Sequence, residues 1–295
     1  MGERLAKMKF VIIGSGGCVC LPKPLCQCKV CIEARQKDGR YKRYGCSIYL
    51  EDASLLVDTP EDIAHALNAA DIRSVERVLY THSDPDHTLG MRIFEQLRLE
   101  WLDYYEKIPP RSPVDVCATP EVMETLNGIG IGYGAMLDYY VKMGLATRKT
   151  ITEPFSVGGA RISAVPVGKS KSVSIFLFEE NGHKVIYAPC DCKPFPLDES
   201  MRNADLLIIG NTFIGDSLKN NRSIGADHPL RQELHSMDDV LDIKRKLSAH
   251  DVIVTHIEEE WGKSYEDYIA LEDIYGVRFA YDGMVAEVRD GIYPT

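Results

Sequence analysis

The sequence predicts a mixed α/β protein in which two sheets pack face to face and helices cover their outer sides. Short apolar runs rich in β-branched residues recur along the chain, and stretches with helical character lie between several of them. Both halves of the chain open with strands that short connections join, which favours two packed sheets over one doubly wound parallel sheet. Neither a linker nor a fixed-period repeat interrupts the sequence, so we expect one domain over residues 1–295.

The expected elements follow these runs in chain order. Strands are expected at residues 9–13, 46–50, 54–58, 77–81, 114–118, 161–167, 173–178, 184–188, 205–209 and 251–255, and a strand pair, 277–281 and 284–288, closes the chain. Helices are expected at residues 61–70, 87–98, 120–127, 134–143 and 234–248. The glycine-rich segment 128–145 predicts a flap or wall, whose Tyr133, Tyr139 and Tyr140 either face a substrate or pack in the core.

Composition excludes several classes of partner. The chain carries 34 basic and 44 acidic residues, a formal net charge of −10, and it has no Lys/Arg block, so a nucleic-acid-binding basic face is not expected. No apolar run approaches the roughly 20 residues that a membrane span needs. We therefore expect a soluble cytoplasmic protein that does not bind membranes. In that compartment nine cysteines indicate metal or redox chemistry more than disulfides.

A cysteine-rich loop occupies residues 18–31, CVCLPKPLCQCKVC. Its Cys26, Cys28 and Cys31 form a C-x-C-x-x-C motif, short enough for one loop to close around a tetrahedral ion. Thiolates suit Zn²⁺, and a structural zinc wants a fourth protein ligand, a Cys or His from elsewhere. The alternative is a group of buried free thiols. Cys18 and Cys20 either line a pocket or form a redox pair.

A second dense set of candidate ligands lies in THSDPDHTLG, residues 81–90, where a strand runs straight into a polar loop. The set comprises His82, Asp84, Asp86 and His87. Three further candidates also stand at or just past the ends of expected strands, where one crevice can collect them: Lys169, Asp191 and His256.

Over nearly the whole chain, the sequence resembles the metallo-β-lactamase superfamily, and most of all its branch with the phosphoribosyl cyclic phosphodiesterase of phosphonate degradation and the PQQ-biosynthesis B protein. The motifs that carry the resemblance are IIGSGG, the C-x-C-x-x-C loop, RYGCSIYLE, LLVDT, TH…DPDH, YAPCD and VTHI. The resemblance implies a four-layer αββα fold. It also implies a structural zinc on Cys26, Cys28 and Cys31, with His228 of ADHPLRQEL as the fourth ligand.

The family pattern H-x-H-x-D-H implies two metal sites. Carried onto this sequence, the second site is complete, with Asp191 as the bridging carboxylate: Asp86, His87, Asp191 and His256. The first site keeps His82, but Asp84 stands at the second histidine and Lys169 aligns with the third. Because a buried charge without a partner is costly, we expect an ion pair between Lys169 and Asp84 in place of the first metal. The centre would then hold one Zn²⁺, Mn²⁺ or Fe²⁺.

These expectations favour a metal-dependent hydrolase that acts on a small anionic substrate, a phosphodiester or cyclic phosphate, with a homodimer as a possible state. Asp86 and Asp191 would hold the metal that activates water, and Lys169 would bind the anion or protonate the leaving group. GSGG, residues 14–17, could offer backbone N–H groups to that anion. Two alternatives stay open. A non-haem iron or thiol redox enzyme would use the possible pocket thiols Cys18, Cys20, Cys190 and Cys192, and a degenerate scaffold would bind metal without turnover.

Overall fold

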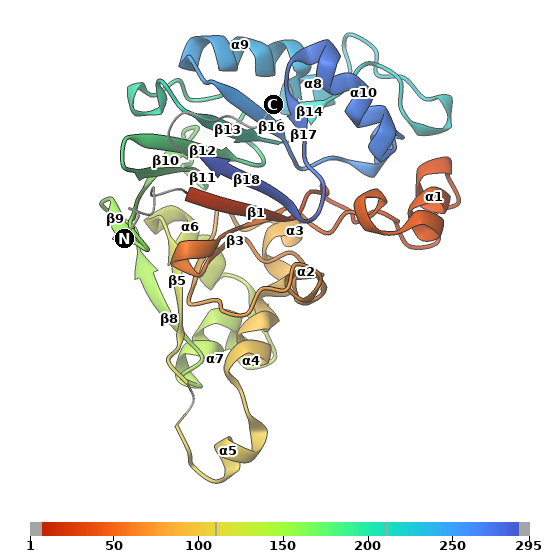
Figure 1. Ribbon diagram of the computed structural model, residues 1–295. Coiled ribbons are helices and arrows are strands. Elements are labelled where there is room, and N and C mark those ends of the chain that lie inside the picture. The colour runs from red at the N-terminus through yellow and green to blue at the C-terminus, as the bar shows by residue number, and fades with distance from the viewer. Residues whose placement is uncertain (1–7, 110, 211, 289–295) are drawn as a thin grey trace, which may run out of the picture.

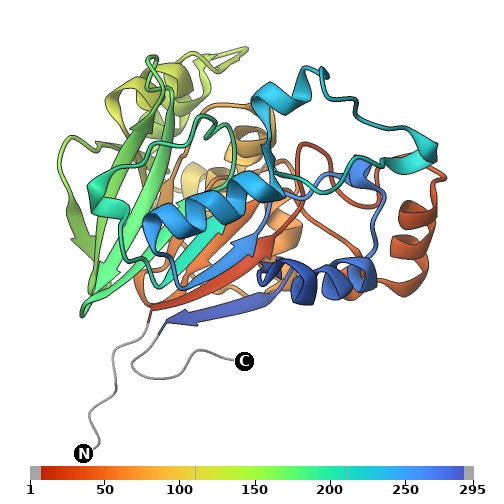
Figure 2. The same ribbon diagram turned by 90° about the horizontal axis from the view of Figure 1, so that it is seen from above.

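The computed structural model describes residues 8–109, 111–210 and 212–288. Two seven-stranded mixed sheets pack face to face, and helices cover the outer side of each (Figures 1 and 2). The predicted four-layer αββα architecture is confirmed.

The first sheet is antiparallel on one side and parallel on the other. Its strands, in spatial order, are β18 (Met284–Val288), β1 (Met8–Gly14), β2 (Ser47–Leu50), β3 (Leu55–Val57), β4 (Arg77–Leu79), β5 (Val114–Ala118) and β8 (Ala146–Thr150). The second sheet runs β17 (Arg278–Phe279), β16 (Asp251–Val254), β13 (Leu206–Ile209), β12 (His183–Ala188), β11 (Val173–Glu180), β10 (Ala160–Val167) and β9 (Phe155–Val157). Two small pairs lie outside these sheets, β6 (Gly130–Ile131) with β7 (Gly134–Ala135) and β14 (Thr212–Phe213) with β15 (His235–Ser236).

The helices divide between the two outer layers. On the side of the first sheet lie α2 (Ile63–Ala69), α3 (Pro85–Thr88), α4 (Ile93–Arg98), α5 (Trp101–Tyr105), α6 (Pro120–Asn127) and α7 (Met136–Lys142). On the side of the second sheet lie α8 (Leu230–Glu233), α9 (Met237–Leu247) and α10 (Tyr265–Tyr275), while α1 (Lys29–Lys37) stands at one end (Figure 1). No helix in the described ranges is long and apolar enough to cross a membrane.

Strand β11 shows why its sequence, VSIFLFEE, is apolar without alternation. Phe176 and Phe178 point into the core between the sheets, and Ile175 and Leu177 point into the core beneath α9. Because successive side chains of a strand face opposite sides, a strand covered on both faces reads as a continuous apolar run.

The expected closing strand pair is wrong. β17 pairs with β16 in the second sheet, and β18 pairs with β1 in the first. The two consecutive strands therefore occupy one edge of each sheet, and the turn between them crosses from sheet to sheet. Gly283 makes this turn at φ 85°, and its N–H donates to the Ile12 carbonyl at 2.8 Å.

The segment 128–145 forms the β6–β7 pair and α7, and its tyrosines differ in burial. Tyr140 is buried in the core beneath the first sheet, whereas Tyr133 is 80% exposed and stacks on Tyr139. The single helix expected over 87–98 is interrupted by a 3₁₀ turn, Leu89–Arg92, where Gly90 lies against the backbone of Pro60 and leaves no room for a Cβ.

Candidate metal centre

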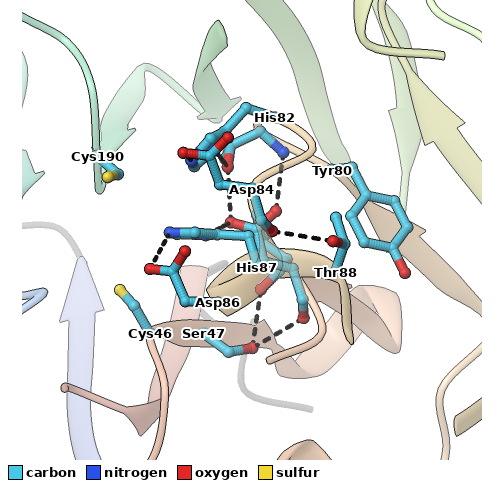
Figure 3. A network of polar contacts seen from close by, with 12 residues as sticks. Cys46, Ser47, Tyr80, His82, Asp84, Asp86, His87, Thr88 and Cys190 are labelled. Atoms are coloured by element: carbon cyan, nitrogen blue, oxygen red, sulfur yellow. Dashed lines mark hydrogen bonds and ion pairs between the residues drawn. The ribbon is translucent and has the colours of Figure 1, made fainter. Parts of the chain in front are cut away.

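The candidate metal centre lies at the carboxyl ends of strands from both sheets, and Figure 3 shows part of its network of polar contacts. Each strand passes directly into a loop that carries candidate ligands or their supports. These are Asp58 after β3, the loop 81–87 after β4, Cys190 and Asp191 after β12, and His256 after β16. Parallel neighbours bring their carboxyl ends together, which is why segments far apart in sequence meet here.

A buried carboxylate orients two of the histidines. Asp58 accepts hydrogen bonds from the Thr81 N–H at 2.8 Å and from the Thr81 hydroxyl at 2.7 Å, and it lies 2.9 Å from Nδ1 of His87. Since the Thr81 hydroxyl donates to Asp58, it accepts from Nδ1 of His82, 2.8 Å away. His82 thus carries its proton on Nδ1 and keeps a free lone pair on Nε2. Burial opposes protonation of His87, but Asp58 and Cys190 raise its pKa well above the usual value, so its Nε2 would release a proton when a metal ion binds.

His256 completes the convergence of ring nitrogens. Its Nδ1 lies 3.4 Å from a Glu258 carboxylate oxygen, and its Nε2 lies 3.3 Å from Nε2 of His87. The Asp86 carboxylate is 3.3 Å from the same atom of His256 and 3.5 Å from that of His87. These two histidines hold the pKa of Asp86 below its usual value although burial opposes this effect.

Two observations show that the residues fit a metal ion. Nε2 of His82 is buried without a hydrogen-bond partner in the described structure, and burial lowers the pKa of this histidine well below its usual value. Between His87 and His256, two ring nitrogens face each other across 3.3 Å. Neutral imidazoles gathered around carboxylates are the donor set that Zn²⁺, Mn²⁺ and Fe²⁺ accept.

Cys190 occupies the centre in place of Asp191. Its Sγ lies within 4.8 Å of ring nitrogens of both His82 and His87, and its thiol also interacts with His256. Asp191 has a left-handed backbone, φ 50°, and its exposed carboxylate approaches His82 and Asp84 instead. In the described structure the turn after β12 buries Cys190 and directs the Asp191 side chain to the rim, and the bridging role of Asp191 stays a prediction.

The three cysteines of the C-x-C-x-x-C motif, the cysteine cluster, converge on one carboxylate. Oε1 of Glu259 lies 3.3 Å from the sulfur of Cys26, 3.1 Å from that of Cys28 and 3.2 Å from that of Cys31. The other oxygen of Glu259 forms an ion pair with Lys219. Burial raises the pKa of Glu259, but Lys219 and the thiols outweigh this effect and lower the pKa to about 2, so the carboxylate is ionised.

The comparisons with known proteins identify the family and the fold. The sequence profile of the family described as "Beta-lactamase superfamily domain" matches residues 53–257. The chain belongs to this superfamily. Among solved structures, it resembles a diphosphatase from the PhnP family at 20% identity and a TM-score of 0.67, over 96% of this chain and 98% of the other. It also resembles Zn²⁺-bound PqqB from Methylobacterium extorquens at 20% identity and a TM-score of 0.68, over 95% and 100% of the two chains.

A third likeness is to the short form of human tRNase Z, with 14% identity and a TM-score of 0.60 over 95% of this chain and 98% of the other. A search of curated proteins found no significant match. At these identities the solved structures establish the fold alone. The predicted superfamily and its hydrolase-like fold are confirmed.

The expectation that His228 is the fourth residue at the cysteine cluster is wrong, because Glu259 occupies that position in the described structure. His228 is exposed, and its Nδ1 accepts a hydrogen bond from the Leu230 N–H at 3.3 Å. Glu259 takes its place because the 3₁₀ turn that follows β16, η6 (Glu259–Trp261), carries that carboxylate to the thiols.

The expected ion pair between Lys169 and Asp84 does not form. Lys169 is exposed in the turn from β10 to β11, where Gly168 and Lys171 take left-handed conformations. The basic group near Asp84 is Nε2 of His82, 3.8 Å away. Burial and the neighbouring Asp191 raise the pKa of Asp84.

The four possible pocket thiols separate into two pairs. Cys190 lies in the centre, and Cys18 lies within 4.8 Å of ligand atoms of Asp86 and His256. Cys20 instead donates to the Pro22 carbonyl at 3.7 Å, and Cys192 is buried and donates to the Cys190 carbonyl at 2.9 Å.

The amides of Ser15, Gly16 and Gly17 are hydrogen-bonded within the protein and are therefore not free to bind a substrate anion. The Ser15 N–H donates to Asp282 at 2.8 Å, the Gly16 N–H to the Tyr44 carbonyl at 2.8 Å, and the Gly17 N–H to the Ile257 carbonyl at 3.1 Å. This segment therefore acts by joining the loop that follows β16 to the rest of the fold.

Sequence reasoning missed three acidic residues that support or complete these sites. They are Asp58, Glu258 and Glu259. Asp58 had a signal, since it ends a strand within the LLVDT motif. The two glutamates had none beyond their place after the strand-end histidine, because the cysteines that they contact are more than two hundred residues away in sequence.

Proposed function

We propose that the chain is a metal-dependent hydrolase whose substrate is a small phosphodiester or cyclic phosphate. One observation carries this proposal: Nδ1 of His82 and Nδ1 of His87 are hydrogen-bonded, Nδ1 of His256 lies 3.4 Å from a Glu258 oxygen, and the three buried imidazoles converge among carboxylates and a thiol. Such support fixes the ring tautomers for metal binding.

The residues divide into an inner and an outer group. Asp86, His87 and His256, together with Cys190, would hold the principal ion. A bound divalent ion would act as a Lewis acid toward a phosphoryl oxygen and acidify a water molecule. The outer group comprises His82, Asp84 and Asp191, and it could hold a second metal ion. The sequence alone had led us to expect one ion at the centre.

The exposed residues would handle the substrate. The Asp84 side chain is 55% exposed, so its carboxylate can orient a water molecule or accept its proton. The Ser174 N–H donates to the Thr81 carbonyl at 2.8 Å, which places the β10–β11 turn beside the strand end that carries His82. From that turn, the exposed ammonium of Lys169 can bind an anionic substrate or protonate its leaving group.

The test is hydrolysis of bis(p-nitrophenyl) phosphate by protein loaded with Zn²⁺, Mn²⁺ or Fe²⁺. We expect turnover with at least one ion, its loss in Asp86→Ala, and its retention in Asp103→Ala, a half-buried carboxylate on α5 that serves as the control. Hydrolysis with none of the ions, or hydrolysis that survives Asp86→Ala, would contradict the proposal.

The Cys190 thiol favours a second candidate, a mononuclear iron redox enzyme on the same fold. Two histidines and a carboxylate form the ligand type of non-haem iron oxygenases, and a nearby thiol suits redox chemistry. Oxygen consumption that requires Fe²⁺ and Asp86, without hydrolysis, would establish this candidate instead.

A further inference from the structure

Glu259 and the metal centre belong to one short segment, residues 256–260. His256 is at its start with its ring in the centre, and Glu259 is three positions later with its carboxylate among the thiols of the cysteine cluster. Three peptide bonds therefore connect a residue of the candidate metal centre to a residue of the cysteine cluster.

The geometry of the cysteine cluster matches a four-ligand ion. Around a tetrahedral zinc with bonds of about 2.3 Å to sulfur and about 2.0 Å to oxygen, sulfur and oxygen lie about 3.5 Å apart. The three sulfur-to-oxygen distances at Glu259, 3.1–3.3 Å, are close to that value. The carboxylate side chain is fully buried, and one oxygen is already used by Lys219, which leaves the other for the ion.

The surrounding positive charges offset the cost of a carboxylate at this position. Replacing a neutral histidine with Glu259 adds one negative charge to a cluster of thiolates. Lys219, with only 17% of its side chain exposed, supplies the compensating positive charge at that carboxylate. Arg35 contributes further, since its guanidinium donates to the Cys26 carbonyl at 2.6 Å.

Glu258 connects this cluster to the centre. Its carboxylate accepts from the Cys18 N–H at 3.1 Å and lies 3.4 Å from Nδ1 of His256, which has no hydrogen-bond partner in the described structure and so points its N–H position at this carboxylate alone. Gly17 makes room for it, because a Cβ there would lie 2.2 Å from the Glu258 carboxyl carbon. The Ile257 N–H donates to the Ser15 carbonyl at 2.9 Å, so backbone pairing also holds the segment.

We propose that Glu259 is the fourth ligand of the ion in the cysteine cluster, and that this ion fixes the 256–260 segment so that Glu258 can orient His256 toward the metal centre. The first half of the proposal concerns the cysteine cluster alone, and the second half rests on the proposed metal centre. Glu258 and Glu259 are positioning residues for the centre. Removing the ion from the cysteine cluster is therefore expected to weaken metal binding at the candidate metal centre, although the two sites share no ligand.

Three matched variants test the proposal: Glu259→Gln, Glu258→Gln and the control Glu124→Gln, which changes an exposed residue of α6. The readouts are zinc per chain and the dissociation constant of the centre for Mn²⁺, by chelator competition. We expect Glu259→Gln to lose about one zinc and to weaken Mn²⁺ binding about ten- to a hundredfold, the range for supports of metal ligands. Glu258→Gln should keep the zinc and show the same weakening, and Glu124→Gln should change neither.

Each half can fail separately. If Glu259→Gln keeps the zinc of the cysteine cluster, Glu259 is not its ligand. If Glu259→Gln loses the zinc, stays folded and binds Mn²⁺ as tightly as wild type, the coupling is absent. X-ray absorption at the zinc edge of wild-type protein with only the cysteine cluster loaded gives an answer even if Glu259→Gln does not fold. Three sulfurs and one oxygen without imidazole scattering would support the proposal, and an imidazole ligand would overturn it.

Discussion

The candidate metal centre and the cysteine cluster are both gatherings of metal-ligand side chains, but they differ in origin and exposure. The centre draws its ligands from loops after β4, β12 and β16, in both sheets, whereas three members of the cluster come from one short loop. At the centre, Asp84 and Asp191 are exposed, whereas Glu259 in the cluster is 3% exposed. An open ligand set suits an ion that meets a substrate, and a closed set suits an ion that holds the fold. The following predictions test this contrast.

The largest expected effect is on stability. Cys28→Ser should remove about one zinc per chain and lower the melting temperature sharply, because metal binding in a site that forms only on folding contributes directly to folding. His87→Ala should remove the ion of the centre and leave the zinc of the cluster in place. Zinc analysis with thermal denaturation checks both, and an unchanged zinc content in Cys28→Ser would mean that the thiols are merely buried.

The next effect concerns the support beneath the centre. Asp58→Asn should weaken Mn²⁺ binding at the centre about ten- to a hundredfold, because the amide cannot hold the proton of His87 on Nδ1 as the carboxylate does. Asp52→Asn, an exposed carboxylate in the same region of the chain, is the control. Equal affinities of the two variants in chelator competition would argue against a metal-supporting role for Asp58.

Cys190 allows a test of ligand softness. Cys190→Ser should lower the preference of the centre for Zn²⁺ over Mn²⁺ by about tenfold, because thiolates favour zinc more than they favour manganese. Dissociation constants for both ions, measured with the cysteine cluster already filled with zinc, would show the change. Cys20→Ser should keep the wild-type ratio, and a wild-type ratio in Cys190→Ser would place the thiol outside the ligand set.

The smallest effect is a pH dependence of stability at His235, which lies beneath the loop after β12. Burial and the neighbouring Lys193 lower the pKa of His235 to about 4. The unfolded chain takes up this proton near the ordinary value of 6.5. The neutral, buried histidine therefore favours folding above pH 6.5, and this contribution is lost as the pH falls toward 4. Between pH 7 and pH 5, the free energy of unfolding measured with urea should fall by roughly 1–2 kcal/mol less in His235→Gln than in wild type. An equal fall in the two proteins would contradict the low pKa of His235.

Much of this protein could be predicted from local pattern. Strand-end positions identified His82, Asp86, His87 and His256, because a strand that runs into a polar ligand leaves a readable signal within a few residues. The cysteine motif was equally local. The run 173–178 was expected to be a strand, and in β11 its side chains alternate between the two hydrophobic cores on either side of the second sheet.

What only the tertiary structure decided were side-chain directions and distant partners. The turn after β12 determines whether Cys190 or Asp191 faces the centre, and a change of one residue in such a turn reverses inside and outside. Glu259, and not His228, lies at the cysteine cluster because a 3₁₀ turn carries it there. Cys31 and Glu259 are 228 positions apart in the sequence, and motif spacing does not predict contacts over such a separation. The chain sequence determines which donors are present near each strand end, while the packing of the two sheets determines which of them meet, because metal binding depends on distances of a few ångströms that no local pattern specifies.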